Sequence, residues 1–154
     1  MISCVATQDE FCHYAYLLNY EFGRTLAVRM VRGNKMRTVD DLFDEFAAAF
    51  QFPCYFGENW NAFDECLADL EWLPASGYVL LVLNAPCVLR DEPSEEFETF
   101  VRIVTSISDE WWERRKKPFH VLFQCEDDER EDLLHRAGRL LTVVPLNELP
   151  PLSG

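Results

Sequence analysis

One apolar segment, Tyr78 to Leu83, limits most strongly what this chain can fold into. Its residues, YVLLVL, are almost continuously apolar, which is typical of a strand that is buried on both faces of a sheet. Segments with helical periodicity precede and follow it, and strands that are joined through helices of this length run parallel. The chain is therefore expected to have an α/β fold with a mainly parallel sheet flanked by helices.

Other segments extend this alternation along the whole chain. Short runs of apolar and β-branched residues predict further strands at Ile2–Ala6, Thr25–Val31, Phe119–Gln124 and Leu140–Val144. Apolar residues at helical spacing predict helices at Gln8–Phe22, from Thr38 to Phe50, at about Glu58–Trp72, from Ser94 to Lys117 and from Glu126 to Gly138. Thr38 and Ser94 are the expected N-caps of two of these helices.

The composition indicates one domain. The chain has 154 residues, of which 49% are hydrophobic, so it can bury a core of ordinary size. Residues 1–148 are expected to form this single domain, and the final residues LPPLSG (149–154) a flexible tail. The 6 cysteines are expected to be reduced and to act as small buried hydrophobic residues.

The net charge restricts the kind of partner. It is formally -13 at pH 7, which argues against binding to nucleic acids or anionic membranes, since both are bound through Lys and Arg. A basic partner, or simply solubility, is indicated instead. The sequence has no apolar run near the roughly 20 residues that cross a bilayer, and its start does not resemble a signal peptide. A cytoplasmic protein is expected.

The stretch FPCYFGENWNAFDECLADL, Phe52 to Leu70, is the candidate for function. On a helical wheel one side of it is apolar and should face the sheet, and this side comprises Trp60, Phe63, Cys66, Leu67 and Leu70. Polar residues form a ridge on another side, namely Glu58, Asn61, Glu65 and Asp69. Tyr55 and Phe56 lie at the entrance to the helix, where Gly57 is expected to allow a sharp turn.

The charges around this ridge have one sign. From Thr38 to Leu89 the chain has nine Asp and Glu residues and no Lys or Arg. A solvated helix face usually mixes signs, because opposite charges one turn apart stabilise a helix and like charges weaken it. Two interpretations are open: a solvated acidic face, or a surface that binds a cationic partner.

Catalytic and metal sites are not predicted. His13, His120 and His135 lie far apart in the sequence without zinc-binding spacing, so no metal site is expected. Cys66 lies on the inward side of its helix and is expected to belong to the core rather than to act as a nucleophile. Glu65 and its neighbours lack the apolar surroundings of an acid–base pair, so the protein is expected to be no enzyme and to need no cofactor.

The motif YFGENWNAFDECL resembles the barstar family, the small intracellular inhibitors of barnase-type ribonucleases. The resemblance rests on Tyr55, Gly57, Asn59 and Cys66 at fixed spacing and on the order of the elements over about Thr25–Gln124. It implies a barstar-like three-layer fold, with an extra N-terminal strand and helix and an extra C-terminal helix and strand. It also implies that the acidic helix and the preceding loop block the active site of a ribonuclease.

The resemblance assigns roles to individual residues. Tyr55 and Asn59 match the family's contacts in the loop before the helix. Glu65 takes the position of the family's principal phosphate-mimicking aspartate, so the charge is kept on a longer side chain. A further acidic contact from the long helix is assigned to either Asp109 or Glu110.

Other positions depart from the family pattern. Asn61 takes the position of a second acidic contact and has lost its charge, whereas Asp64 and Leu70 replace aromatic residues of the reference inhibitor. A shifted carboxylate and missing aromatic residues would leave some groups of barnase poorly paired. The partner is therefore expected to differ from barnase itself.

The predicted function is that of an immunity protein that neutralises a cognate ribonuclease toxin, as in a toxin–antitoxin pair. The expected contact residues are Tyr55, Asn59, Asn61, Asp64, Glu65 and Asp69. The expected partner is a basic ribonuclease or ribonuclease toxin domain, with the protein present as a monomer or as a one-to-one heterodimer with its target. The alternative is an acidic interaction or regulatory module that binds a partner other than a ribonuclease.

Overall fold

The computed structural model of the protein describes residues 3–4 and 7–144. The predicted tail at 149–154, the end of the predicted domain after residue 144 and part of the predicted strand Ile2–Ala6 lie outside the described residues.

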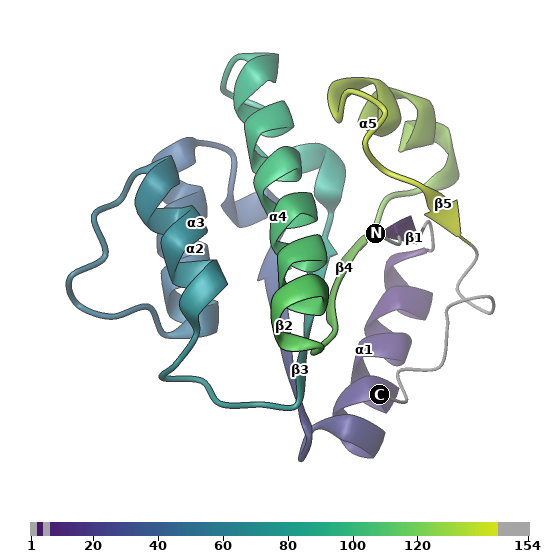
Figure 1. Cartoon of the computed structure of the whole chain (residues 1–154). Coiled ribbons are helices and arrows are strands. Elements are labelled where there is room, and N and C mark those ends of the chain that lie inside the picture. The colour runs from purple at the N-terminus through teal and green to yellow at the C-terminus, as the bar shows by residue number, and fades with distance from the viewer. Residues whose placement is uncertain (1–2, 5–6, 145–154) are drawn as a thin grey trace.

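The central sheet has three parallel strands in the order β2-β3-β4 (Figure 1). These strands are β2 (Leu26–Arg32), β3 (Gly77–Leu83) and β4 (Phe119–Phe123). β3 lies between the other two, and all 7 of its residues are buried. The segment that was predicted to be buried on both faces is therefore the centre of the sheet, and the predicted parallel α/β fold is confirmed.

One face of the sheet is covered by α1 (Gln8–Phe22), whose predicted bounds are confirmed. Phe11 and Leu18 of this helix are buried in a cluster with Val28 of β2 and Leu81 of β3. Because side chains alternate along a strand, residues adjacent to Val28 and Leu81 in sequence point to the opposite face. The sheet therefore carries a separate core on each face.

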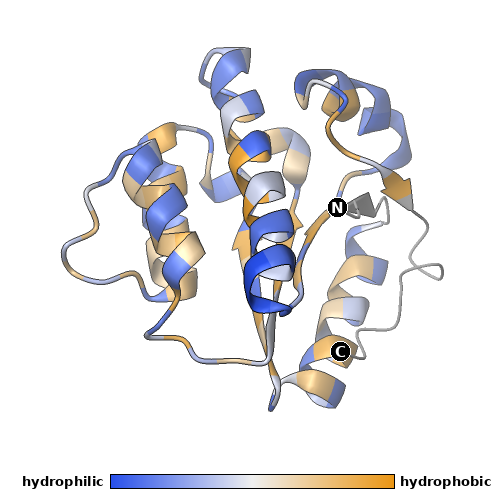
Figure 2. Cartoon of the chain, viewed as in Figure 1, coloured by the Kyte–Doolittle hydropathy of each residue, from blue (hydrophilic) through white to orange (hydrophobic). Residues whose placement is uncertain are grey.

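The opposite face is covered by three helices. They are α2 (Val39–Phe50), α3 (Trp60–Asp69) and α4 (Ser94–Arg115). Their buried residues form one large cluster with the sheet, in which the rings of Phe46 and Phe63 meet edge to face at a centroid distance of 4.9 Å. Figure 2 shows the strands of the sheet as largely hydrophobic and much of the outer surface of α4 as hydrophilic. The three-layer arrangement follows from this burial of apolar side chains on both faces.

The ends of two helices differ in how well they were predicted. The Thr38 hydroxyl accepts a hydrogen bond from the backbone N–H of Asp41 at 3.2 Å and caps α2, as predicted. Ser94, however, is the first residue of α4 and not its cap, so that prediction was wrong by one position. Pro93 takes the capping position, because its extended backbone (φ -56°, ψ 147°) leads directly into the helix.

The two ends of the described chain meet in a second, small parallel sheet (Figure 1). It consists of β1 (Ser3–Cys4) and β5 (Val143–Val144). The helix predicted from Glu126 to Gly138 is instead a short 3₁₀ helix, η3 (Asp127–Glu129), followed by α5 (Arg130–Arg136). Two further 3₁₀ helices are η1 (Gly33–Lys35) and η2 (Ala85–Cys87).

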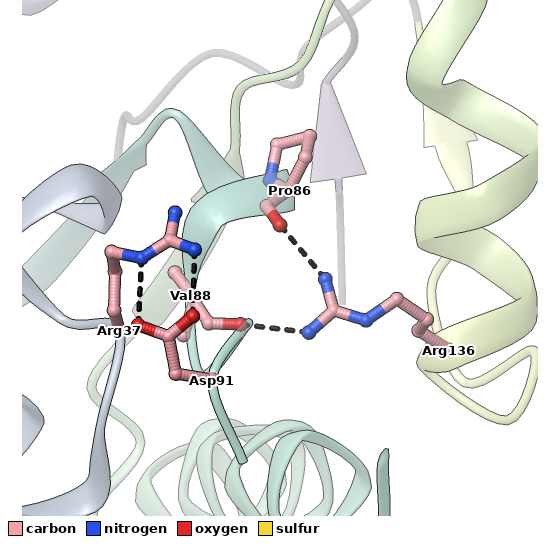
Figure 3. Close-up of polar contacts among 5 residues, drawn as sticks. All are labelled: Arg37, Pro86, Val88, Asp91 and Arg136. Carbon is pink, nitrogen blue, oxygen red and sulfur yellow. Dashed lines mark hydrogen bonds and ion pairs between the residues drawn. The ribbon is translucent and has the colours of Figure 1, made fainter. Parts of the chain in front are cut away.

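The segment after β3, which contains Pro86, Val88 and Asp91, is held by hydrogen bonds from two arginines (Figure 3). Arg136 of α5 donates hydrogen bonds to the carbonyl oxygens of Pro86 and Val88, at 2.9 and 2.8 Å. Arg37 forms two hydrogen bonds with the Asp91 carboxylate, at 2.9 and 2.7 Å, and this guanidinium lowers the pKa of Asp91. α5 is thereby joined to the central part of the fold through backbone carbonyls and not only through side-chain packing.

The cysteine prediction was right for some positions and wrong for others. Cys66 and Cys125 are buried free thiols, and burial, with the nearby carboxylate of Glu129 as a second cause, raises the pKa of Cys125 to about 11. Cys12 and Cys54 are exposed, contrary to the prediction. Cys12 lies next to the buried Phe11 and so falls on the outer side of α1, and Cys54 lies in the loop before α3.

Candidate protein-binding site

The loop between α2 and α3 is anchored by aromatic side chains that point inward. The rings of Phe52 and Phe56 have a centroid distance of 4.9 Å, and Phe56 contacts Phe43 of α2 edge to face at 5.6 Å. While these rings hold the loop, Tyr55 beside them is 79% exposed. An exposed tyrosine on an anchored loop offers a large contact area at a low entropic cost.

The turn into α3 is made by Glu58 and not by Gly57. Glu58 has a left-handed backbone with φ 50°, and Gly57 is not among the residues with positive φ. The turn-forming role predicted for Gly57 was therefore wrong. What favours glycine at this position is space, because an added Cβ atom would lie 3.2 Å from the side-chain nitrogen of Asn59.

α3 is shorter than predicted at both ends. It begins at Trp60, because the left-handed residue Glu58 precedes its cap, and it ends at Asp69, because Leu70 is also left-handed with φ 48°. Glu58 therefore lies outside the helix, and the predicted polar ridge is reduced to its remaining members, which are Asn61, Glu65 and Asp69.

Asn59 is the N-cap of α3. Its Oδ1 accepts a hydrogen bond from the backbone N–H of Ala62 at 2.9 Å, and its Nδ2 donates to the carbonyl oxygen of Gly57 at 3.1 Å. The side chain remains exposed, but both ends of its amide are used within the protein. Asn59 therefore has a folding role in addition to the contact role that the sequence predicted.

We expect Asn59→Ala to lower the free energy of unfolding by about 1 kcal/mol, because the N–H of Ala62 loses its acceptor. Asn59→Asp keeps an oxygen acceptor and should keep most of this stability. Urea unfolding of both variants measures the difference. An alanine variant as stable as the parent would contradict a capping role.

The inward side of α3 is fixed against the long helix α4. Its predicted core residues Phe63, Cys66, Leu67 and Leu70 are all buried, whereas Trp60 is only half-buried. The indole N–H of Trp60 donates to the Glu96 carboxylate at 2.8 Å, and that of Trp111 donates to the Leu67 carbonyl at 2.9 Å. These bonds hold the helix in one orientation, so its outward side chains have defined positions.

The outward side of α3 carries the predicted contact residues. Asn61, Asp64 and Glu65 are exposed, and Asp69 is half-buried. They lie on the same helix that follows the exposed Tyr55, so the structure places the predicted set on one continuous segment of the chain. The arrangement presents carboxylates to solvent on a rigid support.

α4 adds a carboxylate that the sequence could not place. Partial burial, together with the neighbouring charges of Glu110 and Glu65, raises the pKa of Asp64. Of the two candidates Asp109 and Glu110, it is thus Glu110 that lies close to α3. Desolvation is the largest cause of this shift, and the carboxylates of Glu110 and Glu65 add a repulsion that a cationic partner would relieve.

The last turn of α4 also brings cations to this region. Arg114 pairs with Glu110 at 2.6 Å, and Arg115 donates to the backbone carbonyl of Asp69 at 3.1 Å while its guanidinium lies 4.1 Å from the centre of the Trp111 ring. The lack of Lys and Arg between Thr38 and Leu89 is therefore a property of that segment and not of the folded surface. α4, which is distant from α3 in the sequence, thus partly neutralises the negative charge at the end of α3.

We expect Asp64→Asn to raise the melting temperature at neutral pH. Because the pKa of Asp64 is raised above its usual 3.8, the folded protein holds this proton more tightly than the unfolded chain does. The stabilisation from this proton is present below the unfolded pKa and is lost as pH rises through the folded one. The difference in melting temperature between Asp64→Asn and the parent should thus widen as the pH rises above about 4. Asp109→Asn is the control, and a difference in melting temperature that does not change with pH would contradict the raised pKa of Asp64.

Groups of metal-ligating side chains and helices that could span a membrane are both absent from the part of the chain that the structure describes. No group of three or more His, Cys, Asp or Glu side chains is placed there to hold a metal ion. No described helix has both the length and the apolar character needed to span a bilayer.

The structure combines a parallel α/β fold with an exposed acidic helix. The family model described as Barstar (barnase inhibitor) matches residues 26–124, which is more than half of the chain. The chain therefore belongs to the barstar family. Members of this family are inhibitors and not enzymes, and the family implies a ribonuclease as the general kind of partner.

Comparisons beyond the family model add only a likeness in fold. No curated protein matches the chain. Among solved structures, a chain in the structure of Drosophila ORC bound to AT-rich DNA and Cdc6 is similar with a TM-score of 0.53 at 14% identity, covering 94% of this chain and 48% of that one. A chain in the corresponding complex with GC-rich DNA has a TM-score of 0.51 at 13% identity, covering 94% and 49%. This protein thus spans about half the length of those chains, and at such low identity the likeness concerns the fold alone.

Proposed function

We propose that this protein is the immunity protein of a cognate ribonuclease toxin and blocks the toxin's active site with α3 and the preceding loop. The observation that carries the proposal is the exposure of Glu65 on a helix whose opposite side is locked into the core. The family membership supports a ribonuclease as the partner.

The proposed mechanism is steric and electrostatic. A ribonuclease active site gathers cationic side chains to hold the phosphates of RNA, and carboxylates at phosphate-like positions can pair with the same cations. A carboxylate on a side chain carries no phosphodiester bond, so the inhibitor occupies the site without being cleaved. Tyr55 would add apolar contact area beside the charged residues, where exposed aromatic side chains most often contribute binding energy.

The remaining contacts are assigned in the same proposal. Asn61, Asp64 and Asp69 would surround Glu65 on α3, with Glu110 of α4 as the further acidic contact. Asn59 would contribute both the cap of α3 and a contact at the loop. Because the protein is strongly acidic and a ribonuclease basic, opposite fields should also speed their encounter.

The experiment is an assay of the purified protein against a ribonuclease toxin domain encoded by a neighbouring gene. Inhibition in vitro, and relief of toxicity when the two are co-expressed in the cytoplasm, are the expected results. The association rate should fall as salt rises, since the Debye length is about 10 Å at 0.1 M. Stable binding to a partner without ribonuclease activity, with no effect on the ribonuclease, would favour the alternative of an acidic interaction or regulatory module.

A further inference from the structure

A pocket with a volume of about 500 Å³ lies at the amino-terminal end of β2. It is lined by residues 23–27, Arg29, residues 73–76 and Lys117, and so shares no residue with the proposed ribonuclease-binding surface. Arg24, Arg29 and Lys117 are its charged residues, and no Asp or Glu is among its lining residues. In a chain with a formal charge of -13, this is a local concentration of positive charge.

The three cations come from two parts of the chain, and hydrogen bonds hold Lys117 and Arg29 in place. Lys117 donates from Nζ to the carbonyl oxygen of Ala75 at 2.8 Å, which fixes the ammonium at the pocket wall and leaves it further donors. Arg29 donates from one nitrogen to the carbonyl oxygen of Val28 at 3.0 Å, and a guanidinium has four other N–H groups. The pocket therefore presents two positively charged groups that are held in place and still have free hydrogen-bond donors.

The pocket adjoins an open edge of the central sheet. β2 pairs only with β3 among the described strands, so the other side of β2 has no neighbouring strand there. Backbone groups of alternate residues in a parallel ladder point to opposite sides. On the outer side, the backbone N–H of Arg32 donates to the Glu45 carboxylate at 3.1 Å, and the Val28 carbonyl oxygen accepts a hydrogen bond from Arg29.

The same alternation directs the backbone N–H groups of Leu26, Val28 and Met30 outward. No hydrogen bond of the described residues uses these groups. They form a row of unpaired donors that leads to the cation-lined pocket, which includes Leu26 and Arg29 in its wall. Leu26 and Val28 are only 7% exposed, because their side chains pack against α1 in one apolar cluster. A row of unpaired backbone donors at the edge of a sheet can accept an added strand.

We propose that this edge binds an acidic peptide segment in extended conformation. The segment adds a strand beside β2, and one of its carboxylates enters the pocket between Arg24, Arg29 and Lys117. Charge complementarity selects the occupant, because the pocket wall has cations and no carboxylate, and a basic or neutral segment leaves these cations without partners. Binding at this edge is independent of the proposed ribonuclease inhibition.

The test uses the full chain, labelled with nitrogen-15, and the peptide Thr-Val-Glu-Val-Glu-Thr as probe. The expected result is saturable binding in which the amide protons of Leu26, Val28 and Met30 become protected from exchange. The peptide Thr-Val-Gln-Val-Gln-Thr should bind more weakly by up to about fivefold, the upper end of the effect expected for partly exposed ion pairs. Inorganic phosphate that shifts the arginine resonances, while the peptide protects no amide, would overturn the proposal and leave only a small-anion site.

Charge reversal tests the pocket directly. Arg29→Glu and Arg24→Glu should each weaken the acidic peptide at least about fivefold, since each removes one attraction and adds a repulsion. Arg102→Glu on the exposed side of α4 makes the same change of charge elsewhere and should leave the peptide affinity unchanged. Arg24 is exposed, so its variant tests the proposal even where Arg29→Glu alters the edge strand. Equal peptide binding by Arg24→Glu and the parent would overturn the proposal. The proposed ribonuclease inhibition should be the same in all three variants.

Discussion

Replacing Glu65 with arginine is expected to abolish ribonuclease inhibition while the protein remains folded. Glu65 is exposed on the outer side of α3, so no buried contact depends on its charge. In the proposed complex the same carboxylate is covered and paired with cations of the active site. Removing one partner of a buried ion pair costs about 3–5 kcal/mol, because the other charge is left unpaired. At about 1.4 kcal/mol per tenfold change, affinity should fall at least about a hundredfold, and the introduced repulsion should lower it further.

The measurements for Glu65→Arg are the inhibition constant against the ribonuclease and the urea midpoint of the variant alone. Glu131→Arg makes the same change of charge on the exposed surface of α5 and should inhibit as the parent does. If Glu65→Arg fails to fold, the residue belongs to the core and the proposed surface is wrong. If it folds and still inhibits, the contact lies elsewhere on the protein.

Replacing Arg136 with methionine is expected to cause a large loss of stability, of about 2–4 kcal/mol in the free energy of unfolding. The side chain is half-buried and donates to the carbonyls of Pro86 and Val88, and its guanidinium lies 4.4 Å from the centre of the Phe97 ring. Burial lowers the pKa of Arg136, with neighbouring Arg90 as a second cause, so two charge-assisted bonds offset this cost. Methionine keeps the apolar length of the side chain but leaves both carbonyls without these donors.

Urea unfolding of Arg136→Met measures this loss, with Arg102→Met as the control at an exposed arginine of α4. Arg136→Lys keeps a positive charge but not the forked geometry that spans two carbonyls, so its stability should lie between those of the parent and the methionine variant. A stability of Arg136→Met within about 0.5 kcal/mol of the control would contradict the stabilising role of the Arg136 hydrogen bonds, since that is the usual range for surface changes.

The stability of Arg136→Met also tests the role of the part of the chain that lies outside the match to the family model. α5 lies after residue 124, where the match to the family model ends. Its arginine binds the segment after β3, which lies inside the match. The C-terminal addition is thus expected to contribute to the stability of the family fold, and not only to extend its surface.

Much of the fold could be predicted from local sequence. The apolar run at β3 predicted the centre of the sheet, and the spacing of apolar residues predicted α1 at its observed bounds. Both signals depend on short-range geometry, because side chains alternate along a strand and repeat every 3.6 residues along a helix. Helix ends were less predictable. Non-glycine residues at Glu58 and Leu70 adopt left-handed conformations that their residue types do not favour, so tertiary contacts must hold them.

The candidate site, too, could be predicted from the sequence only in part. The spacing within one helix predicted which residues of α3 face the core and which face solvent, and the exposure of Asn61 and Glu65 agrees with it. The sequence contained no signal that Trp60 would bind Glu96, and it left open whether Asp109 or Glu110 would lie near Asp64. Those pairs are separated by more than thirty residues and meet only when α3 packs on α4.

By itself, the sequence determined the parallel α/β fold, the inward and outward sides of the acidic helix and the family to which the chain belongs. The fold and the two sides of the helix follow from the order and periodicity of neighbouring residues, whereas the family follows from the motif around α3 and the match to the family model. Only the tertiary structure decided the electrostatics of the site, where Glu110 raises the charge density beside Asp64 and Arg115 binds the end of α3. The physical reason is that charges interact through space, so their effect depends on which helices pack together and not on their positions along the chain.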